Sequence, residues 1–229
     1  MKRILFILLL ASLFTITQST QCNKARDLCD GQYKTDTVLL NLNLLNPSAE
    51  YRQYDTIWIN SDINDNFNPV SGNPASFSNN IEQLYLTVQP YQVKTDAALP
   101  YLQYANIEFN PVVRDGSLEN VNTGGYIFKF RRVSPYNKVS AGLVAGRPGL
   151  YFIECNHSTY PYAGGGNFQI YNGNNGCVSF WGKSEFPPCQ QNIDLWNSFG
   201  SSSLSIPQNY GNQIVNESSR NYVLFKVVP

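Results

Sequence analysis

Hydrophobic and polar residues alternate with a period of two along most of the chain. Leu40, Leu42 and Leu44 fall on one side of an extended segment, with asparagines between them, and residues 46–48 (NPS) end the run. Such alternation predicts half-buried β-strands, because successive side chains of a strand point to opposite faces. Similar runs predict about ten strands in all, the others being 54–60, 84–88, 107–109, 126–130, 139–143, 150–152, 168–170, 178–180 and 223–227.

Gly, Pro, Asn, Asp and Ser separate these runs, as turns require. Residues 172–176 (NGNNG) predict a hairpin loop, and residues 147–149 (RPG) predict a turn into the next strand. No amphipathic helix of ordinary length is visible. Evenly spaced strands without crossover helices predict an all-β, antiparallel sandwich with long loops. No composition shift divides residues 21–229, so we expect one β-sandwich domain there.

Two segments resemble recurring strands of extracellular immunoglobulin-like domains. Residues 54–59 (YDTIWI) resemble a short early strand with the pattern D-T-hydrophobic. Residues 147–153 (RPGLYFI) resemble the P-G-x-Y turn that leads into a late strand. The resemblance covers about a tenth of the chain. It implies an Ig-like β-sandwich and carries no active site.

The N-terminus predicts export. Two basic residues, Lys2 and Arg3, precede an apolar run over residues 4–16, and small polar residues follow. The run is too short to cross about 30 Å of hydrocarbon, so residues 1–20 are expected to be a signal peptide cleaved after Ser19 or Thr20. No later segment is apolar enough to span a bilayer. We therefore expect a secreted protein, whether extracellular, periplasmic or held at a cell surface.

The composition of the chain excludes some classes of binding partner. Basic and acidic residues number 16 each, so the chain has no net field to attract nucleic acid or an anionic membrane surface. Only 14% of the residues are charged, whereas Tyr and Phe contribute 15 and 13 side chains. This composition suits strands better than helices. No motif indicates a cofactor, and none is expected.

Five cysteines are present, and an exported protein is expected to oxidise them. Cys177 and Cys189 flank one short segment and are the favoured disulfide. Cys22 and Cys29 are expected to form a second bridge, unless Cys22 begins the mature chain as a lipid-modified residue. Gln21 stands where a lipoprotein signal has a small residue, which speaks against this anchor. Because the number of cysteines is odd, one cysteine is expected to remain free. Judged from its own position in the sequence, Cys155 is expected to be half of a structural disulfide.

His157 is the sole histidine, so any serine or cysteine nucleophile activated by histidine must use it. It follows a predicted strand and no Gly-x-Ser-x-Gly elbow accompanies it, so we expect a solvated loop histidine without a catalytic role. Glycoside hydrolysis needs two carboxylates at a set separation, and nothing in the sequence pairs the glutamates. Asn156 and Asn216 lie in glycosylation sequons, which have meaning only in a cell that glycosylates exported chains.

An Asn/Asp-rich segment offers a calcium candidate. Asp62, Asn64 and Asn66 place oxygen-bearing side chains at alternate positions. Phe67 stands where an EF-hand loop has glycine, and Asn73 stands where that loop has its bidentate glutamate. A surface turn is the favoured interpretation, so no metal is predicted, and a calcium site completed by distant loops is the alternative.

Aromatic residues surround a flexible glycine tract at residues 164–166. Exposed aromatic rings can stack on sugar faces while amides bind hydroxyl groups. Tyr160, Tyr162, Tyr171 and Trp181 are therefore the candidate binding residues, although the same rings suit core packing. The sequence thus favours a non-catalytic interaction module that binds protein or glycan through loops or exposed aromatics. A secreted carboxylate-dependent hydrolase and a lipid-anchored structural envelope protein are the alternatives.

Overall fold

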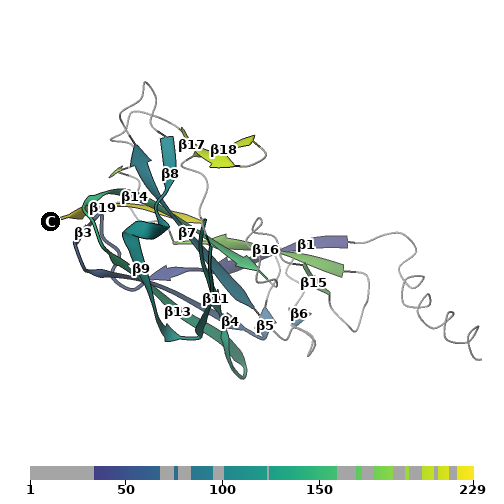
Figure 1. Cartoon of the computed structure of the whole chain (residues 1–229). Coiled ribbons are helices and arrows are strands. Elements are labelled where there is room, and N and C mark those ends of the chain that lie inside the picture. Colours follow the sequence, from purple (N-terminus) through teal and green to yellow (C-terminus); the bar gives the residue numbers. More distant parts are fainter. Residues whose placement is uncertain are drawn as a thin grey trace, which may run out of the picture.

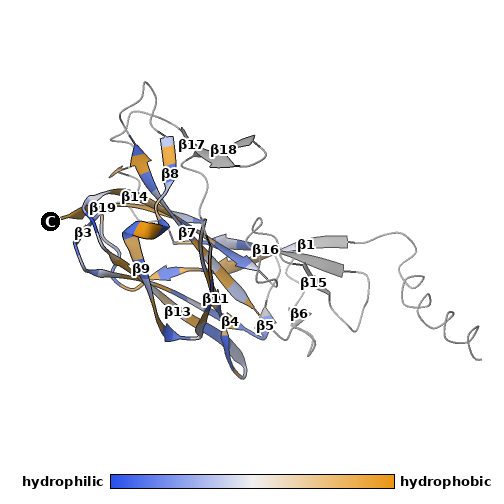
Figure 2. Cartoon of the chain, in the orientation of Figure 1, coloured by the Kyte–Doolittle hydropathy of each residue, from blue (hydrophilic) through white to orange (hydrophobic). Residues whose placement is uncertain are grey.

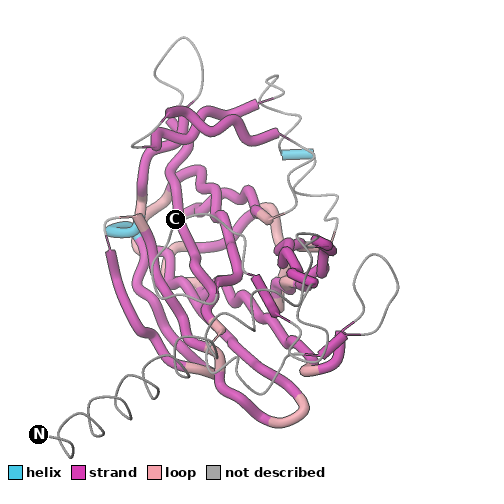
Figure 3. Tube along the Cα trace, turned by 90° about the vertical axis from the view of Figure 1, so that its right-hand side faces the viewer, coloured by secondary structure: helices cyan, strands magenta, loops and turns pink. Residues whose placement is uncertain are grey.

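The computed structural model describes residues 34–67, 75–76, 84–94, 101–122, 124–158, 169–171, 178–187, 194–195, 203–208, 211–216 and 221–229. These residues are nearly all in β-strands (Figures 1 and 3). Among them, no helix is long and apolar enough to span a bilayer. The expected all-β, sandwich-like fold is confirmed.

The larger sheet has nine strands and follows the order β18-β17-β8-β7-β14-β19-β3, with β11 on β7 and β10 on β11. Its central strands are β7, β14 and β19, which pair antiparallel. The bounds are β3 Glu50–Arg52, β7 Tyr85–Lys94, β8 Tyr101–Tyr104, β10 Ser117–Asn122, β11 Gly125–Lys129, β14 Gly149–Ser158, β17 Ser203–Gln208, β18 Gly211–Asn216 and β19 Tyr222–Val228.

The second sheet has five strands in the order β12-β13-β4-β2, and β9 joins the free edge of β13. Its long central pair, β4 and β13, is antiparallel from Tyr136↔Asn64 to Val144↔Thr56. The bounds are β2 Asn43–Leu44, β4 Thr56–Asn64, β9 Phe109–Asp115, β12 Arg131–Val133 and β13 Tyr136–Ala145.

Two smaller sheets complete the described strands. β1 (Lys34–Asn41), β16 (Val178–Glu185) and β15 (Gln169–Tyr171) form a three-stranded sheet that extends to one side in Figure 1. β5 (Asn66–Phe67) pairs with β6 (Ala75–Ser76). β15 and β16 pair antiparallel, as the hairpin predicted at residues 172–176 requires. The pairing is mixed rather than purely antiparallel, because β1–β16, β19–β3 and β17–β8 are parallel.

The core lies between the two main sheets and follows the alternation read from the sequence. Ile57, Ile59, Ser61 and Ile63 of β4 are buried on one face, whereas the residues between them on the other face are half-buried or exposed. On the opposing sheet, Tyr151 and Ile153 of β14 belong to the same buried cluster. Figure 2 accordingly shows both apolar and polar segments along these strands.

The other face of β14 has its own smaller apolar cluster. Phe152 packs there with Tyr91 of β7 and Leu224 of β19, and Leu102 of β8 completes the buried set. The central part of the larger sheet is therefore buried on both faces. This explains why β14 reads as a nearly continuous apolar run rather than a clean alternation.

Two predicted strands begin later than expected. Residues 106–108 form a 3-10 helix, η2 (Asn106–Glu108), and extended structure resumes at Phe109. Tyr54 lies in a turn with φ 74°, and β4 begins only at Thr56. In both places a short apolar pattern cannot distinguish a strand from the turn that precedes it.

Candidate functional site

The side of the five-stranded sheet that faces away from the main core carries a mostly half-buried, partly exposed surface, which we call the outer face. On β4 it consists of Thr56, Trp58, Asn60, Asp62 and Asn64. Residues paired directly across an antiparallel ladder share a face. The register therefore adds residues from two neighbouring strands, which are Tyr136, Lys138, Ser140, Gly142 and Val144 of β13 and Asn110 and Val112 of β9.

Trp58 lies on the outer face directly opposite Gly142. A Cβ atom at Gly142 would come within 2.9 Å of Trp58 Cζ3, 2.8 Å of Thr56 Cγ2 and 2.7 Å of Val112 Cγ2. Only glycine leaves room for the indole at this position. The indole thus lies close to the backbone of β13 at Gly142, and the methyl groups of Thr56 and Val112 approach the same position.

Arg114 of β9 covers this tryptophan. Its guanidinium carbon lies 4.3 Å from the Trp58 ring centroid, a cation–π distance. Asp115, the next residue, pairs instead with Arg131. Arg114 itself is exposed and, within the part of the chain that the structure describes, forms no ion pair.

Polar pairs continue the outer face beyond Trp58. Ser140 Oγ donates a hydrogen bond to Asn60 Oδ1 at 2.6 Å. Lys138 Nζ lies 3.5 Å from Asp62 Oδ2 and 5.5 Å from the Tyr136 ring centroid. The tyrosine is 40% exposed. An aromatic ring, amides, a hydroxyl and opposite charges therefore follow one another along a regular sheet.

Two of the calcium candidate residues, Asp62 and Asn64, lie at the end of this face, and both side chains have partners within the protein. Asp62 is engaged by Lys138, and the Asn64 side chain accepts a hydrogen bond from the Asn66 backbone N–H at 2.9 Å. Asn66 has passed into β5. Over the described ranges, no cluster of three His, Cys, Asp or Glu residues could hold a metal ion.

The aromatic binding candidates are placed only in part. Tyr171 pairs with Ser179, and Trp181 pairs with Gln169, so both lie on the β15–β16 hairpin of the three-stranded sheet. The remaining sequence predictions that fall outside the described residues are Tyr160, Tyr162, the signal peptide at residues 1–20 and the expected disulfide partners Cys22, Cys29, Cys177 and Cys189.

The prediction that His157 is a solvated loop residue is wrong. His157 belongs to β14, points into the core side and is 0% exposed. The strand continues to Ser158 because β7 pairs with it along residues 151–158. The Phe130 ring lies beside it, with its centroid 5.7 Å away. The apolar run in the sequence ends before β14 does. The last residues of the strand are polar, and polar neighbours form hydrogen bonds with them.

Hydrogen bonds fix the tautomer of His157. Ser61 Oγ donates to the Asn41 carbonyl at 3.0 Å, so it must accept from His157 Nε2–H, 2.9 Å away. Ser184 Oγ accepts from the His157 backbone N–H at 2.9 Å and donates to Nδ1 at 2.7 Å. Every group of the neutral imidazole is satisfied. Burial lowers the pKa of His157 to about 3.

This Ser–His–Ser arrangement is structural rather than catalytic. Ser61 and Ser184 are 0% and 4% exposed, so no substrate reaches either hydroxyl. Each serine proton is already committed to an acceptor. The three residues come from β4, β14 and β16, which belong to three different sheets. The contact therefore joins these sheets at one buried point.

Glu154 is a second buried polar group, on the opposite face of β14. Its Oε1 accepts from Asn156 Nδ2 at 3.1 Å and Asn221 Nδ2 at 3.2 Å, and Tyr91 also hydrogen bonds to it. Desolvation raises the pKa of Glu154, and these donors oppose the rise. The sequon residue Asn156 thus uses its amide within the sheet, where Asn221 Nδ2 also donates to its Oδ1 at 2.9 Å.

Three other described glutamates have partners of different kinds. Glu108 pairs with Arg147, and Glu185 pairs with Lys183. Glu119 accepts from Ser117 Oγ at 2.9 Å. None of these contacts brings two carboxylates together, which is the geometry that glycoside hydrolysis requires.

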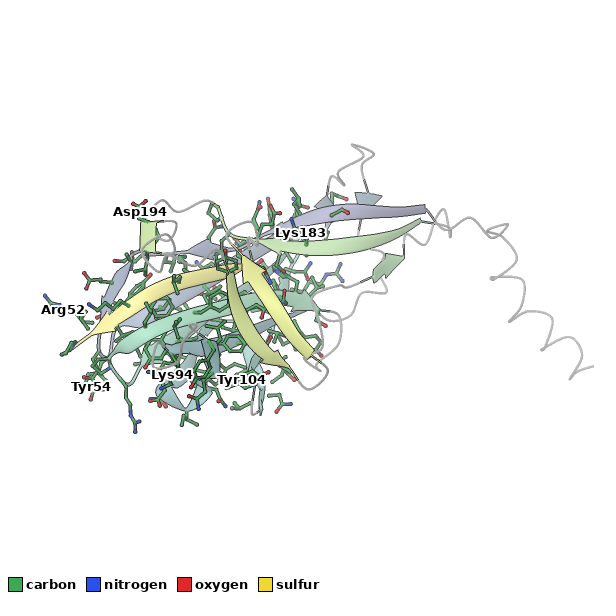
Figure 4. All side chains as sticks on the ribbon, turned by 90° about the horizontal axis from the view of Figure 1, so that it is seen from above. Arg52, Tyr54, Lys94, Tyr104, Lys183 and Asp194 are labelled. Atoms are coloured by element: carbon green, nitrogen blue, oxygen red, sulfur yellow. The ribbon has the colours of Figure 1, made fainter. Side chains whose placement is uncertain are left out.

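One end of the sandwich exposes two large apolar side chains. Tyr54 is 72% exposed in the turn before β4, and Ile107 is 85% exposed on η2. The backbone ties these turns together, because Tyr54 N–H donates to the Ala145 carbonyl at 2.8 Å and Gly146 N–H to the Glu108 carbonyl at 2.7 Å. We call Tyr54 and Ile107 the loop-end pair. Tyr54 is labelled in Figure 4, beside Arg52.

Comparison with known proteins does not place the chain in a family. No protein-family model matches it, and no curated protein is significantly similar. Among solved structures, the chain is similar to the crystal structure of the CupB6 tip adhesin from Pseudomonas aeruginosa, at 17% identity and a TM-score of 0.25. That match covers 66% of this chain and 40% of the adhesin chain. A likeness this distant assigns no function.

Sequence reasoning missed the Trp58–Gly142–Arg114 arrangement. The alternation places Trp58 on a strand, but its partners come from β9 and β13, and only strand register brings them together. The available signal was a single glycine inside the predicted strand 139–143, which indicates the close approach of another group.

Proposed function

We propose that this chain is an exported, non-catalytic binding module and that its outer face holds a glycan. The main support is the series of groups along that face, where the exposed Tyr136 ring and the Arg114 guanidinium on Trp58 lie to either side of an amide and a pair of opposite charges. Sugar ligands are recognised by this combination of ring faces and hydrogen-bonding groups. β4 and β13 are anchored in the core, so the groups stand on a rigid support.

A glycan array with the full mature chain tests this proposal. Asp62→Ala and Tyr136→Ala remove exposed groups of the outer face and are expected to cost little stability, because surface ion pairs contribute under about 1 kcal/mol. We expect each to weaken glycan binding, whereas Tyr54→Ala, at the loop end, leaves it unchanged. Glycan binding that survives both outer-face variants contradicts the proposed site.

The β15–β16 hairpin is a second position for the same function. The sequence predicts sugar-stacking rings at Tyr171 and Trp181, which lie on paired strands of the three-stranded sheet. Trp181→Ala in the same array separates the two positions. Loss of binding with Trp181→Ala alone assigns the ligand to the hairpin and removes it from the outer face.

Export is the remaining part of the proposal, and the leader at residues 1–20 supports it. The intact mass of the protein recovered from its native host tests it. Cleavage after Ser19 or Thr20 is expected, whereas a diacylglyceryl group on Cys22 indicates an anchored envelope protein. An uncleaved leader contradicts export.

Protein binding at the loop end is a second candidate function. The loop-end pair supports it, because Tyr54 keeps a left-handed backbone that is unfavourable for tyrosine while exposing its ring. Tyr54→Ala and Ile107→Ala are expected to weaken capture of a protein partner and to leave glycan binding intact. A partner whose affinity neither variant changes contradicts this candidate.

A further inference from the structure

The guanidinium of Arg114 is held in place before any ligand arrives. It lies over the Trp58 ring, and that ring is seated against Gly142. A free arginine side chain loses rotamer entropy when it is fixed. Here the tryptophan has already restricted the side chain. Ligand binding therefore costs less side-chain entropy, because the arginine is already partly ordered within the protein.

The charge of Arg114 has no carboxylate partner among the described residues. Arg131, Arg132 and Arg147 each pair with an acidic side chain, at Asp115, Asp65 and Glu108. Like Arg114, Arg52 forms no ion pair within the described residues. Unlike Arg114, it has no stacking contact with an aromatic ring there. Among the arginines that the structure describes, Arg114 alone combines an exposed guanidinium, a stacking contact with an aromatic ring and a charge without an ion-pair partner.

We infer that Arg114, stacked on Trp58, is a subsite for an oxyanion carried by the ligand, a carboxylate or a sulfate group on an acidic glycan. The inference rests on the proposed function and names the ligand class of the same face. The guanidinium fork matches the two oxygens of such a group in a bidentate contact. The neighbouring amide of Asn60 and the Tyr136 ring then contact neutral parts of the same glycan.

The selectivity follows from local geometry rather than from a long-range field. The chain has a formal net charge of zero, so acidic polymers are not attracted from a distance. On the outer face Lys138 is compensated by Asp62, and Arg131 by Asp115. Among the described residues of this face one uncompensated charge remains, so the affinity should depend only weakly on salt.

Binding of polygalacturonate, its fully methyl-esterified form and dextran sulfate to the full mature chain tests the subsite. The acid should bind more tightly than its ester, and Arg114→Ala should remove a factor of roughly ten to a hundred, the value of a charge-assisted contact. Arg114→Lys should lose most of the same factor, because lysine keeps the charge without the fork. Arg52→Ala is the matched control and should bind as wild type does. Dextran sulfate separates sulfate from carboxylate recognition.

Equal affinity of the wild type and Arg114→Ala for both acidic polymers overturns the inference. If Arg114→Lys binds the acidic polymers as tightly as the wild type does, a positive charge is sufficient without the guanidinium geometry. This result also overturns the inference. A neutral glycan can also distinguish the two proposals. If Asp62→Ala abolishes its binding and Arg114→Ala does not, the proposed function stands and the acidic subsite is contradicted. If the wild-type chain binds no glycan on the array, both the proposed function and the acidic subsite are contradicted.

Discussion

His157 Nε2 lies 2.9 Å from Ser61 Oγ, and this contact joins the two main sheets across the buried interior. Ser184 on β16 holds the other ring nitrogen at 2.7 Å. The donors and acceptors match only if the imidazole is neutral and carries its proton on Nε2. A charged ring would place a second proton against Ser184 Oγ, whose own proton already points to Nδ1.

The histidine is therefore expected not to titrate in the native protein between pH 8 and pH 5, because its pKa is lowered to about 3 by burial. Since the chain has one histidine, ¹⁵N NMR of the imidazole reads this directly. Folding lowers this pKa from 6.5, so its contribution to stability is complete above about pH 6.5 and is lost as the pH falls toward 3. A native-state midpoint near pH 6.5, or an Nδ1–H signal, contradicts the buried arrangement.

Glu154→Gln is expected to stabilise the fold at neutral pH. Desolvation raises the pKa of Glu154, so its favourable contribution is present below the unfolded pKa of about 4.3 and is lost as the pH rises through the folded value. Glutamine keeps an acceptor for Asn156 and Asn221 without a buried charge. The melting temperature of the variant should exceed that of the wild type at pH 7, and the gain should shrink toward pH 4. A lower melting temperature at pH 7 means that the charge itself is favourable there.

Much of the architecture follows from alternation alone. Leu40 and Leu42 are buried while Asn41 and Asn43 are exposed, as a half-buried strand requires. β10 escaped prediction because Ser117–Val121 is exposed along its length, so no apolar period marks it. The residues of β17 and β18 mix Ser, Gln and Asn with a few aliphatic residues, which is a pattern also typical of loops.

The sites were less predictable than the strands for a physical reason. Asp62 and Asn64 drew attention because they are close in sequence, but Trp58, Gly142 and Arg114 meet only through the pairing of β4, β13 and β9. His157 was misjudged for the same reason. Its partners, Ser61 and Ser184, lie on other sheets, and nothing near His157 in sequence indicates burial.

Cys155 is expected to be the odd thiol. It is free, 0% exposed and part of the main core, and burial raises the pKa of its thiol. This corrects the expectation that it is half of a disulfide. The native protein should show no reactive thiol, and one should appear on unfolding without reductant, provided that the other four cysteines pair. Rapid labelling of Cys155 in the native state would contradict its place in the core.

Gly142→Ala should destabilise the fold by about 1–3 kcal/mol, the usual cost of overpacking. The new methyl group would lie within 3.0 Å of Trp58, Thr56 and Val112, and neither the rigid ring nor the β-branched side chains can yield cheaply. Denaturant unfolding measures the loss. Asn110→Ala, an exposed position on the same face, is the control for a substitution without a clash. A stability equal to wild type would show that Trp58 is not held against the strand.

Tyr54→Gly should raise stability by about 1 kcal/mol relative to Tyr54→Ala, because glycine alone adopts positive φ without a steric cost. Tyr54 has φ 74°, and its side chain is 72% exposed, so replacing it removes strain and forfeits little packing. Alanine at the same position keeps the strain and is the matched control in chemical denaturation. The backbone bond from Tyr54 N–H to the Ala145 carbonyl survives both changes. Equal stability of the two variants would mean that the turn relaxes away from the left-handed conformation. A glycine variant that gains stability and loses a protein partner would show that the strained tyrosine is kept for binding.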